Sequence, residues 1–251
     1  MDQFAQILDD AALQAEAIPQ ISLSSQLSLA EAYHVQDLLL KKCVDRGEQV
    51  VGVKLGFTSL AKMEQMGVKE IIWGSLTDRM RFHSGDEVSI ENFIHPRAEP
   101  EIAFLIGKNI DGHISLQNIE QFVQGVAVAV EIIDSRYRDF KFSLEDVVAD
   151  NCSSAAFAVG SWYPVSTPIS NIEISLSFNN EMVETGNSSA ILGDPWNSLV
   201  TAVGLLRSHN RILKAGDIVL AGAATAARFF ESGFLVEAHA EGLGSVGLRI
   251  V

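Results

Sequence analysis

Two glutamates separated by one residue are the first positions whose chemistry calls for an explanation. Glu99 and Glu101 lie in His95-Pro-Arg-Ala-Glu-Pro-Glu-Ile-Ala-Phe-Leu-Ile, a pattern typical of a turn leading into a strand. Residues two apart in a strand point to the same face, so the pattern predicts that the carboxylates converge. Converging carboxylates repel unless a proton or cation lies between them. A hard divalent cation satisfies this arrangement, while an exposed strand start with two solvated glutamates is the alternative.

A third glutamate strengthens the metal hypothesis. Glu131 interrupts a run of Val, Ala and Ile residues that is otherwise typical of a buried strand, and an unpaired charge there would be costly. Its neighbours on the same face are alanines, which leave room for a ligand. A buried salt bridge to Arg97 or Arg136 is the alternative interpretation. Three carboxylates without a Cys or His ligand set favour Mg²⁺ or Mn²⁺ over Zn²⁺, so we predict one of these ions as cofactor, held by Glu99, Glu101 and Glu131.

Three other polar positions are candidates for acid-base chemistry or substrate binding. Lys54 has apolar neighbours and nearby glycines, which favours a partly desolvated lysine that acts as an acid or base or binds a carboxylate. An edge-strand lysine whose head reaches water is the alternative. Asp78 fits an acid-base group or a turn residue equally. The segment Asp150-Asn-Cys-Ser-Ser154 has the polar groups to bind a substrate, but a helix-ending turn has the same composition.

The elements that must position these residues change in character near residue 48. Apolar residues with i, i+3, i+4, i+7 spacing predict an amphipathic helix over residues 2–17. Ser28 and Glu31 form a capping-box pattern for a second helix that ends near Gly47. We therefore predict an N-terminal helical unit over residues 1–48 and a mixed-sheet catalytic domain over residues 49–251 that carries the metal site.

Short apolar runs bounded by turn residues predict the strands of the second unit. The Asn179-Asn180 pair predicts a hairpin turn, and Asp194 followed by Pro195 predicts a helix start. Because strands and helices do not alternate regularly, a mixed-sheet α+β fold is favoured over a doubly wound one. The predicted strands are 50–57, 101–106, 126–133, 155–159, 172–178, 218–221 and 235–240, and the predicted helices are 60–66, 116–124, 144–149 and 195–207.

Composition excludes several classes of function. The 251 residues carry 18 basic and 32 acidic side chains, a formal charge of −14, without a basic cluster, so nucleic acid is not expected as a partner. No run reaches the roughly 18 uninterrupted apolar residues of a membrane span, and the N-terminus lacks a signal-peptide core. We expect a cytoplasmic protein without membrane contact. Cys43 and Cys152 are predicted to be buried thiols.

Several longer motifs resemble one enzyme family over nearly the whole chain. The sequence is similar to the 2-oxo-3-hexenedioate (4-oxalocrotonate) decarboxylases, which are close relatives of the 2-hydroxypentadienoate hydratases within the fumarylacetoacetase-like superfamily. The wording of three motifs, which begin at Lys62, Trp73 and Ala221, favours the decarboxylase branch. The motifs are Gly52-Val-Lys-Leu-Gly-Phe-Thr-Ser59, Lys62-Met-Glu-Gln-Met-Gly-Val68, Trp73-Gly-Ser-Leu-Thr-Asp78, His95-Pro-Arg-Ala-Glu-Pro-Glu101, Glu131-Ile-Ile-Asp-Ser-Arg-Tyr137, Phe142-Ser-Leu-Glu-Asp-Val-Val-Ala-Asp-Asn151 and Ala221-Gly-Ala-Ala-Thr-Ala226.

This resemblance implies a fold, an activity and a set of roles. It implies a mixed β-sheet roll or sandwich of the fumarylacetoacetase C-terminal type, and metal-dependent decarboxylation of 2-oxo-3-hexenedioate in meta-cleavage degradation of aromatic compounds. The resemblance carries the metal ligands over to the three glutamates. Lys54 and Asp78 are the predicted catalytic residues, and Ser153, Ser154 and Arg97 the predicted substrate-binding residues.

Two other functions stay open, together with two expected associations. The same metal scaffold would also serve hydration of 2-hydroxypenta-2,4-dienoate. A non-catalytic partner that stabilises a neighbouring pathway enzyme is the alternative of another class. We expect a homo-oligomer, and the resemblance implies a complex with the hydratase that consumes the decarboxylation product.

Overall fold

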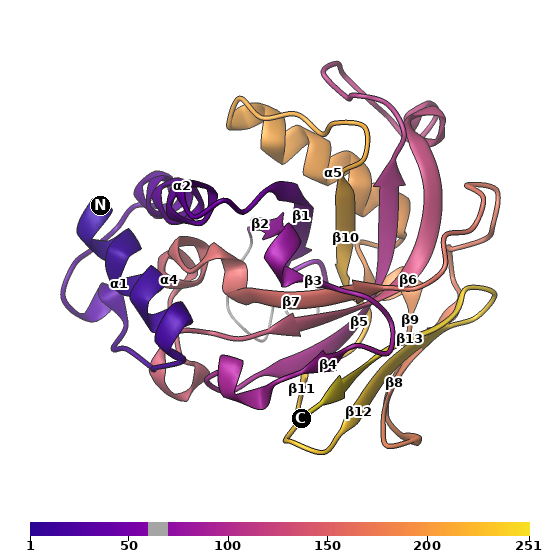
Figure 1. Cartoon of the computed structure of the whole chain (residues 1–251). Helices are drawn as coiled ribbons and strands as arrows, with labels where there is room; N and C mark the ends of the chain where they lie inside the picture. Colours follow the sequence, from indigo (N-terminus) through magenta and orange to yellow (C-terminus); the bar gives the residue numbers. More distant parts are fainter. Residues whose placement is uncertain (60–69) are drawn as a thin grey trace.

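Two packed β-sheets form the body of the protein in this computed structural model, which describes residues 1–59 and 70–251 (Figure 1). The larger sheet contains, in spatial order, β2 (Ile72–Thr77), β1 (Val50–Gly56), β10 (Ile218–Ala223), β5 (Arg97–Ile106), β6 (Val123–Ile133), β7 (Ser154–Val159) and β3 (Arg81–Phe82), with β11 (Arg228–Phe229) paired to β5. The smaller sheet contains β4 (Glu87–Val88), β13 (Gly244–Ile250), β12 (Leu235–Ala240), β8 (Glu173–Phe178) and β9 (Glu181–Asn187).

The long antiparallel pair β5 and β6 forms the centre of the larger sheet. Alternation along both strands turns one set of side chains, including Ile102 and Val128, into the core shared with Val236 and Leu248 of the smaller sheet. The opposite face of β5 and β6 carries alanines and, at the strand ends, the three glutamates. Two-residue periodicity therefore separates a packing face from a face with room for polar groups, as the sequence predicted.

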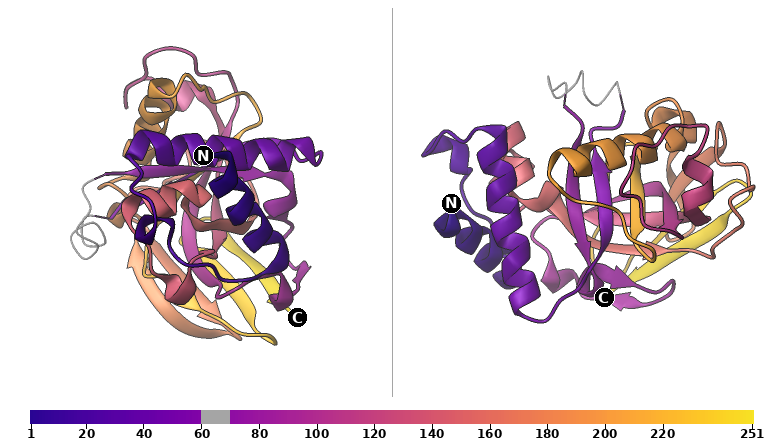
Figure 2. Two further views of the ribbon diagram at one scale, coloured as in Figure 1. Left: turned by 90° about the vertical axis from the view of Figure 1, so that its left-hand side faces the viewer. Right: turned by 90° about the horizontal axis from the view of Figure 1, so that it is seen from above.

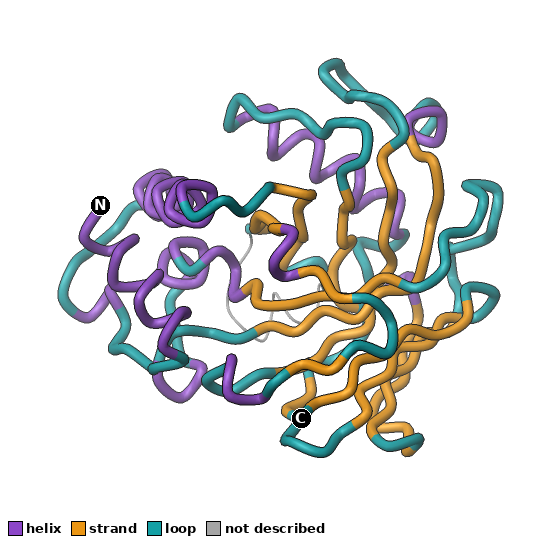
Figure 3. Tube along the Cα trace, viewed as in Figure 1, coloured by secondary structure: helices purple, strands orange, loops and turns teal. Residues whose placement is uncertain are grey.

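Helices lie outside the sheets, as Figure 3 shows by colour. The helices α1 (Asp2–Gln14) and α2 (Leu29–Asp45) pack on each other at one end of the molecule, and α2 also contacts α4 (Leu144–Ala149) and β2. The helix α5 (Pro195–Ser208) packs on β10 and lies across the strands in the right-hand view of Figure 2. In the described part of the chain, no helix has the length and apolar character needed to cross a membrane.

Most of the predicted elements are confirmed. The sheet is mixed, because β1 pairs parallel with β10 and antiparallel with β2, and the predicted α+β fold is therefore correct. Ser28 and Glu31 form the predicted capping box, and Asp194 caps α5 by accepting a hydrogen bond from the backbone of Trp196. Asn179 and Asn180 both have positive φ values, of 51° and 67°, in the predicted turn between β8 and β9.

Other predictions were wrong or lie outside the described residues. The predicted helix 116–124 is only a 3-10 turn over Ile119–Phe122, because Val123 already pairs with Ile106 as part of β6. The strands β2, β9 and β13 were not predicted, nor were the two-residue strands β3, β4 and β11. The exposed residues of β9 are mostly polar, so its sequence lacks a clear apolar alternation. In β13, glycines occupy two of the seven positions, which weakens the strand pattern. The predicted helix 60–66 lies outside the described residues.

Candidate metal centre

The three predicted ligand residues meet on one face of the β5 and β6 pair. Glu99 stands directly opposite Glu131 in the register of the two strands, and Glu101 follows two residues along β5 on the same face. All three side chains are buried, with Glu101 and Glu131 at 0% exposure. One carboxylate oxygen of each lies within 4.8 Å of the others. This arrangement has the charge and donor type that a hard divalent cation requires.

The hydrogen bonding of Glu101 fits a metal ligand. Its Oε2 accepts a hydrogen bond from the backbone N–H of Gly222 at 2.7 Å, which fixes the carboxylate. Its Oε1 is buried and has no hydrogen-bond partner within the described ranges. A buried carboxylate oxygen without a partner is costly, and a cation would satisfy it. The donor set therefore fits Mg²⁺ or Mn²⁺.

Steric constraints require a glycine at position 222. Its φ of 105° lies in the left-handed region, and a Cβ at this position would stand 2.1 Å from Oγ1 of Thr58. The backbone irregularity that brings this N–H to Glu101 falls where the pairing register of β10 and β5 shifts, between Leu220 and Ala223. Such a bulge re-aims a backbone group, and only glycine fits here.

Lys54 of β1 completes the cluster. Its side chain is 4% exposed, and its Nζ lies 3.1 Å from the carboxylate of Glu131. Burial disfavours the ammonium form, but the negative charge of Glu131 and its neighbours outweighs burial and raises the pKa of Lys54 above its usual value. The lysine is therefore a charged hydrogen-bond donor. The salt bridge predicted as an alternative for Glu131 is not the one formed, since Arg136 pairs with Asp150.

The two most buried carboxyl groups have altered acidity. Burial raises the pKa of Glu101 well above its usual value, and the neighbouring Glu131 raises it further. Burial also raises the pKa of Glu131, although the Lys54 ammonium opposes this. Without a cation, the site therefore keeps protons at a pH where ordinary carboxyl groups have lost them.

We expect Mn²⁺ to stabilise the protein more at about pH 8 than at about pH 5.5, because bound metal must displace these protons. Glu101 and Glu131 have a higher pKa in the folded protein than in the unfolded chain, where a glutamate has a pKa of ~4.3. The metal-free fold therefore has its full stability from these groups below that pH. This contribution is lost as the pH rises through their raised pKa in the folded protein. Thermal unfolding with and without Mn²⁺ at both pH values measures the difference. Equal shifts in the unfolding midpoint at the two pH values would contradict the expectation.

A mostly apolar pocket of about 100 Å³ opens beside the cluster. Among its polar lining groups, Lys54 and Glu99 belong to the cluster, and the Ser153 Oγ is buried without a hydrogen-bond partner in the described part of the chain. A ligand hydrogen bond would satisfy that hydroxyl. The apolar lining residues are Leu55, Phe57, Ile72, Ile133, Phe140, Phe142, Val147 and Ala223.

A strained turn presents Cys152 and Ser153 to this pocket. Asn151, Cys152 and Ser153 have φ values of 48°, 54° and 59°, so three consecutive non-glycine residues are left-handed. The Asn151 side chain accepts a hydrogen bond from the N–H of Ser75 and donates one to its carbonyl, at 2.8 and 2.9 Å. The Cys152 thiol donates to the Trp73 carbonyl. These contacts with β2 hold the turn in place.

Replacing Asn151 with alanine should lower the free energy of unfolding by about 2–4 kcal/mol, because it leaves a buried N–H and a buried carbonyl of Ser75 without partners. Asn180→Ala is the matched control, since Asn180 is also left-handed but exposed. Denaturant unfolding of both variants measures the difference. Equal losses would show that backbone conformation alone, and not the contact with β2, accounts for the effect.

The other predicted site residues lie outside the glutamate cluster. Asp78 is exposed beyond the end of β2 and accepts a hydrogen bond from the Gln49 backbone, as a turn residue does. The Arg97 guanidinium lies 4.2 Å from the ring centre of Phe140, so it supports a pocket wall. Ser154 lines a different cavity. The hydrogen bonds of Asn151 with Ser75 and that of Gly222 with Glu101 were not predicted, since these partners are distant in sequence.

The chain is similar to one family of known proteins over most of its length. Residues 53–251 match the family described as Fumarylacetoacetate (FAA) hydrolase C-terminal. The chain is 46% identical over 246 residues to a 4-oxalocrotonate decarboxylase from Pseudomonas sp, covering 98% of this chain and 96% of that protein. It is 33% identical to a 2-keto-4-pentenoate hydratase from Paraburkholderia xenovorans (strain LB400), covering 88% and 83%.

Solved structures of two complexes are similar over the entire chain. One of them is a 4-oxalocrotonate decarboxylase from Pseudomonas putida G7 complexed with magnesium and adipate, with a TM-score of 0.95 and 33% sequence identity. The superposition covers 100% of this chain and 97% of that one, so the N-terminal helices α1 and α2 fall within the shared architecture.

Proposed function

The chain belongs to the fumarylacetoacetate (FAA) hydrolase C-terminal family, and from that premise we propose that it is a metal-dependent decarboxylase of 2-oxo-3-hexenedioate (4-oxalocrotonate). The products are 2-hydroxypenta-2,4-dienoate and CO₂. The observation that carries the proposal is the cluster of three buried carboxylates with a charged lysine beside an apolar pocket. The 46% identical relative named for this reaction supports it.

Glu99, Glu101 and Glu131 would hold Mg²⁺ or Mn²⁺. A bound ion supplies Lewis-acid stabilisation of the negative charge that reaches the 2-oxo oxygen as CO₂ leaves, worth roughly several kcal/mol. The magnesium named for the solved decarboxylase and the absence of Cys or His from the ligand set both support this ion type.

The chain's own residues contribute charge, orientation and exclusion of water. The Lys54 Nζ, held charged by Glu131, donates a hydrogen bond to a substrate oxygen and holds the substrate in register. Its raised pKa favours this donor role over that of a base. The Ser153 hydroxyl offers a second hydrogen bond. The apolar wall solvates a carboxylate poorly and CO₂ well, which favours release of CO₂.

Hydration of 2-hydroxypenta-2,4-dienoate is the second candidate, because a 33% identical relative is named for a hydratase reaction. Hydration requires a water molecule and a group that activates it, whereas Leu55, Ile72 and Val147 give the described pocket wall an apolar character. This observation favours decarboxylation. Cytoplasmic location, homo-oligomer formation and a complex with a hydratase stay predictions.

The deciding experiment incubates metal-stripped protein with 2-oxo-3-hexenedioate, with and without Mg²⁺, and follows CO₂ release together with the dienol absorbance. Metal-dependent CO₂ release is the expected result. If CO₂ is not released but 2-hydroxypentadienoate is turned over with metal, the decarboxylase proposal is wrong and the hydratase replaces it. Inactivity on both substrates would favour the non-catalytic partner.

A further inference from the structure

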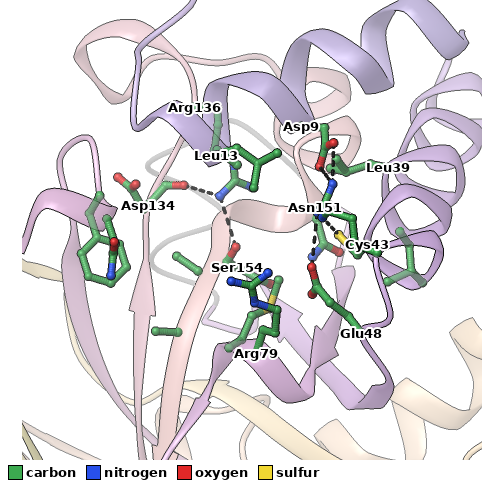
Figure 4. A pocket seen from close by; sticks show the side chains of 18 of the residues that line it. Asp9, Leu13, Leu39, Cys43, Glu48, Arg79, Asp134, Arg136, Asn151 and Ser154 are labelled. Carbon is green, nitrogen blue, oxygen red and sulfur yellow. Dashed lines mark hydrogen bonds and ion pairs between the residues drawn. The ribbon is translucent and has the colours of Figure 1, made fainter. Parts of the chain in front are cut away.

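A second cavity, of about 230 Å³, lies where α1 and α2 meet the larger sheet (Figure 4). We call it the helix-side cavity. Asn151 and Ser154 line it, whereas Cys152 and Ser153, from the same turn, line the pocket beside the glutamates. The glutamate cluster and Lys54 take no part in its wall. The helix-side cavity is therefore separate from the candidate metal centre.

Most charged groups on the wall of this cavity are already paired inside the protein. The buried guanidinium of Arg136, for example, binds Asp150 and three backbone carbonyls. Groups satisfied in this way have little to offer a ligand. The other internal pairs are Asp9 with Arg46 at 2.6 Å, Glu48 with Arg46 at 3.3 Å and with the Thr77 hydroxyl at 2.7 Å, and Asp134 with the N–H groups of Ile94 and His95, each at 2.8 Å.

Arg79 is the exception. Within residues 1–59 and 70–251 its guanidinium has no hydrogen bond or ion pair, and Figure 4 shows it directed toward Ser154. A cation without an internal partner at the wall is suited to a carboxylate, which a guanidinium binds through two parallel hydrogen bonds.

Apart from the internally paired polar groups, the wall is mostly apolar, and this determines the rest of the ligand. Leu13, Leu39 and Met80 are among the side chains that line it. A fully hydrated inorganic anion gains nothing from such a surface, whereas a hydrocarbon body is stabilised by burial. The volume lies below the ~300–1,000 Å³ of sites for drug-sized ligands, so the ligand is small, of about one ring.

We propose that the helix-side cavity binds a small organic carboxylate with an apolar body. The carboxylate lies at the Arg79 guanidinium, and the hydrocarbon part lies against the side chains of α1 and α2. Because Arg79 is exposed at the end of β2, the ligand enters from solvent without passing through the metal centre.

Titration calorimetry with benzoate on EDTA-treated protein tests the proposal, since removal of metal prevents binding of the carboxylate at the glutamates. We expect saturable binding that persists in Lys54→Met and weakens by about tenfold or more in Arg79→Gln. Arg81→Gln is the matched control, because Arg81 is an exposed arginine two residues away that does not line the cavity. Benzyl alcohol, which lacks the charge, should bind more weakly than benzoate.

A filling variant and a crystal soak complete the test. Leu13→Trp should abolish benzoate binding by occupying the cavity, and density for benzoate should lie at Arg79. No saturable benzoate binding, binding unchanged by Arg79→Gln, or binding lost in Lys54→Met would each overturn the proposal. Density for a second copy of the chain in the cavity would overturn it as well.

Discussion

Replacing Lys54 with methionine should lower the rate of CO₂ release by about 10²- to 10⁴-fold, the range expected when a positioned hydrogen-bond donor or acid is removed. Methionine keeps the apolar stem and removes only the charge that lies 3.1 Å from Glu131. Mn²⁺ binding should persist in this variant, because the three carboxylates stay in place and the competing ammonium is gone. Steady-state kinetics together with Mn²⁺ titration separates the two effects.

Lys108→Met serves as the control for this variant, since Lys108 is an exposed lysine just beyond the end of β5. It should leave both turnover and Mn²⁺ affinity unchanged. Lys54→Met with full turnover would remove Lys54 from the mechanism. Loss of Mn²⁺ binding in Lys54→Met would mean instead that the lysine is needed to form the glutamate cluster itself.

Replacing Glu131 with glutamine should abolish stabilisation by Mn²⁺ and lower the free energy of unfolding of the metal-free protein by about 3–5 kcal/mol. The reason is that Glu131 has two roles. It supplies one of the three converging carboxylates, and it is the ion-pair partner of a lysine with 4% exposure. An amide in its place leaves the Lys54 ammonium buried without a full counter-charge, so part of the loss comes from the desolvated lysine.

The double variant Lys54→Met/Glu131→Gln identifies the source of that instability. It should be more stable than Glu131→Gln alone, because no unpaired ammonium remains, and it should still fail to bind Mn²⁺. Denaturant unfolding and Mn²⁺ titration measure both quantities. Glu181→Gln on the exposed edge strand β9 is the matched control and should change neither. A Glu131→Gln protein that binds Mn²⁺ normally would exclude Glu131 from the metal site.

The glutamate cluster was predictable because it depends on local alternation. Glu99 and Glu101 share a face through strand periodicity, and the small residues around Glu131 mark the face of β6 that does not pack against the smaller sheet. What sequence could not supply was the register that sets Glu99 opposite Glu131. Register depends on the pairing of two strands separated by a long loop, and that pairing is a property of the whole sheet.

The backbone features of the site were less accessible from sequence. Gly222 acts through a backbone N–H that every residue except proline possesses, and its importance follows only from Thr58 standing where a Cβ would be. The Asn151 side chain forms hydrogen bonds with both backbone groups of Ser75, which lies 76 positions away in the sequence. The catalytic role of Asp78 stays a prediction, and the fold places its exposed side chain at a turn, where it accepts a hydrogen bond from the backbone. Such long-range contacts leave no periodic signal in the sequence.

The contacts of α2 with the sheet have a consequence for how the protein opens. The buried Gln36 side chain donates hydrogen bonds to the backbone carbonyls of Trp73 and Val148, one at the start of β2 and one in α4. Local detachment of α2 would break both hydrogen bonds together and uncover the buried apolar residues that α2 packs against, so it costs nearly as much as opening the structure behind them. Amide hydrogens of α2 should therefore exchange with solvent deuterium as slowly as those of β2, in one cooperative unit.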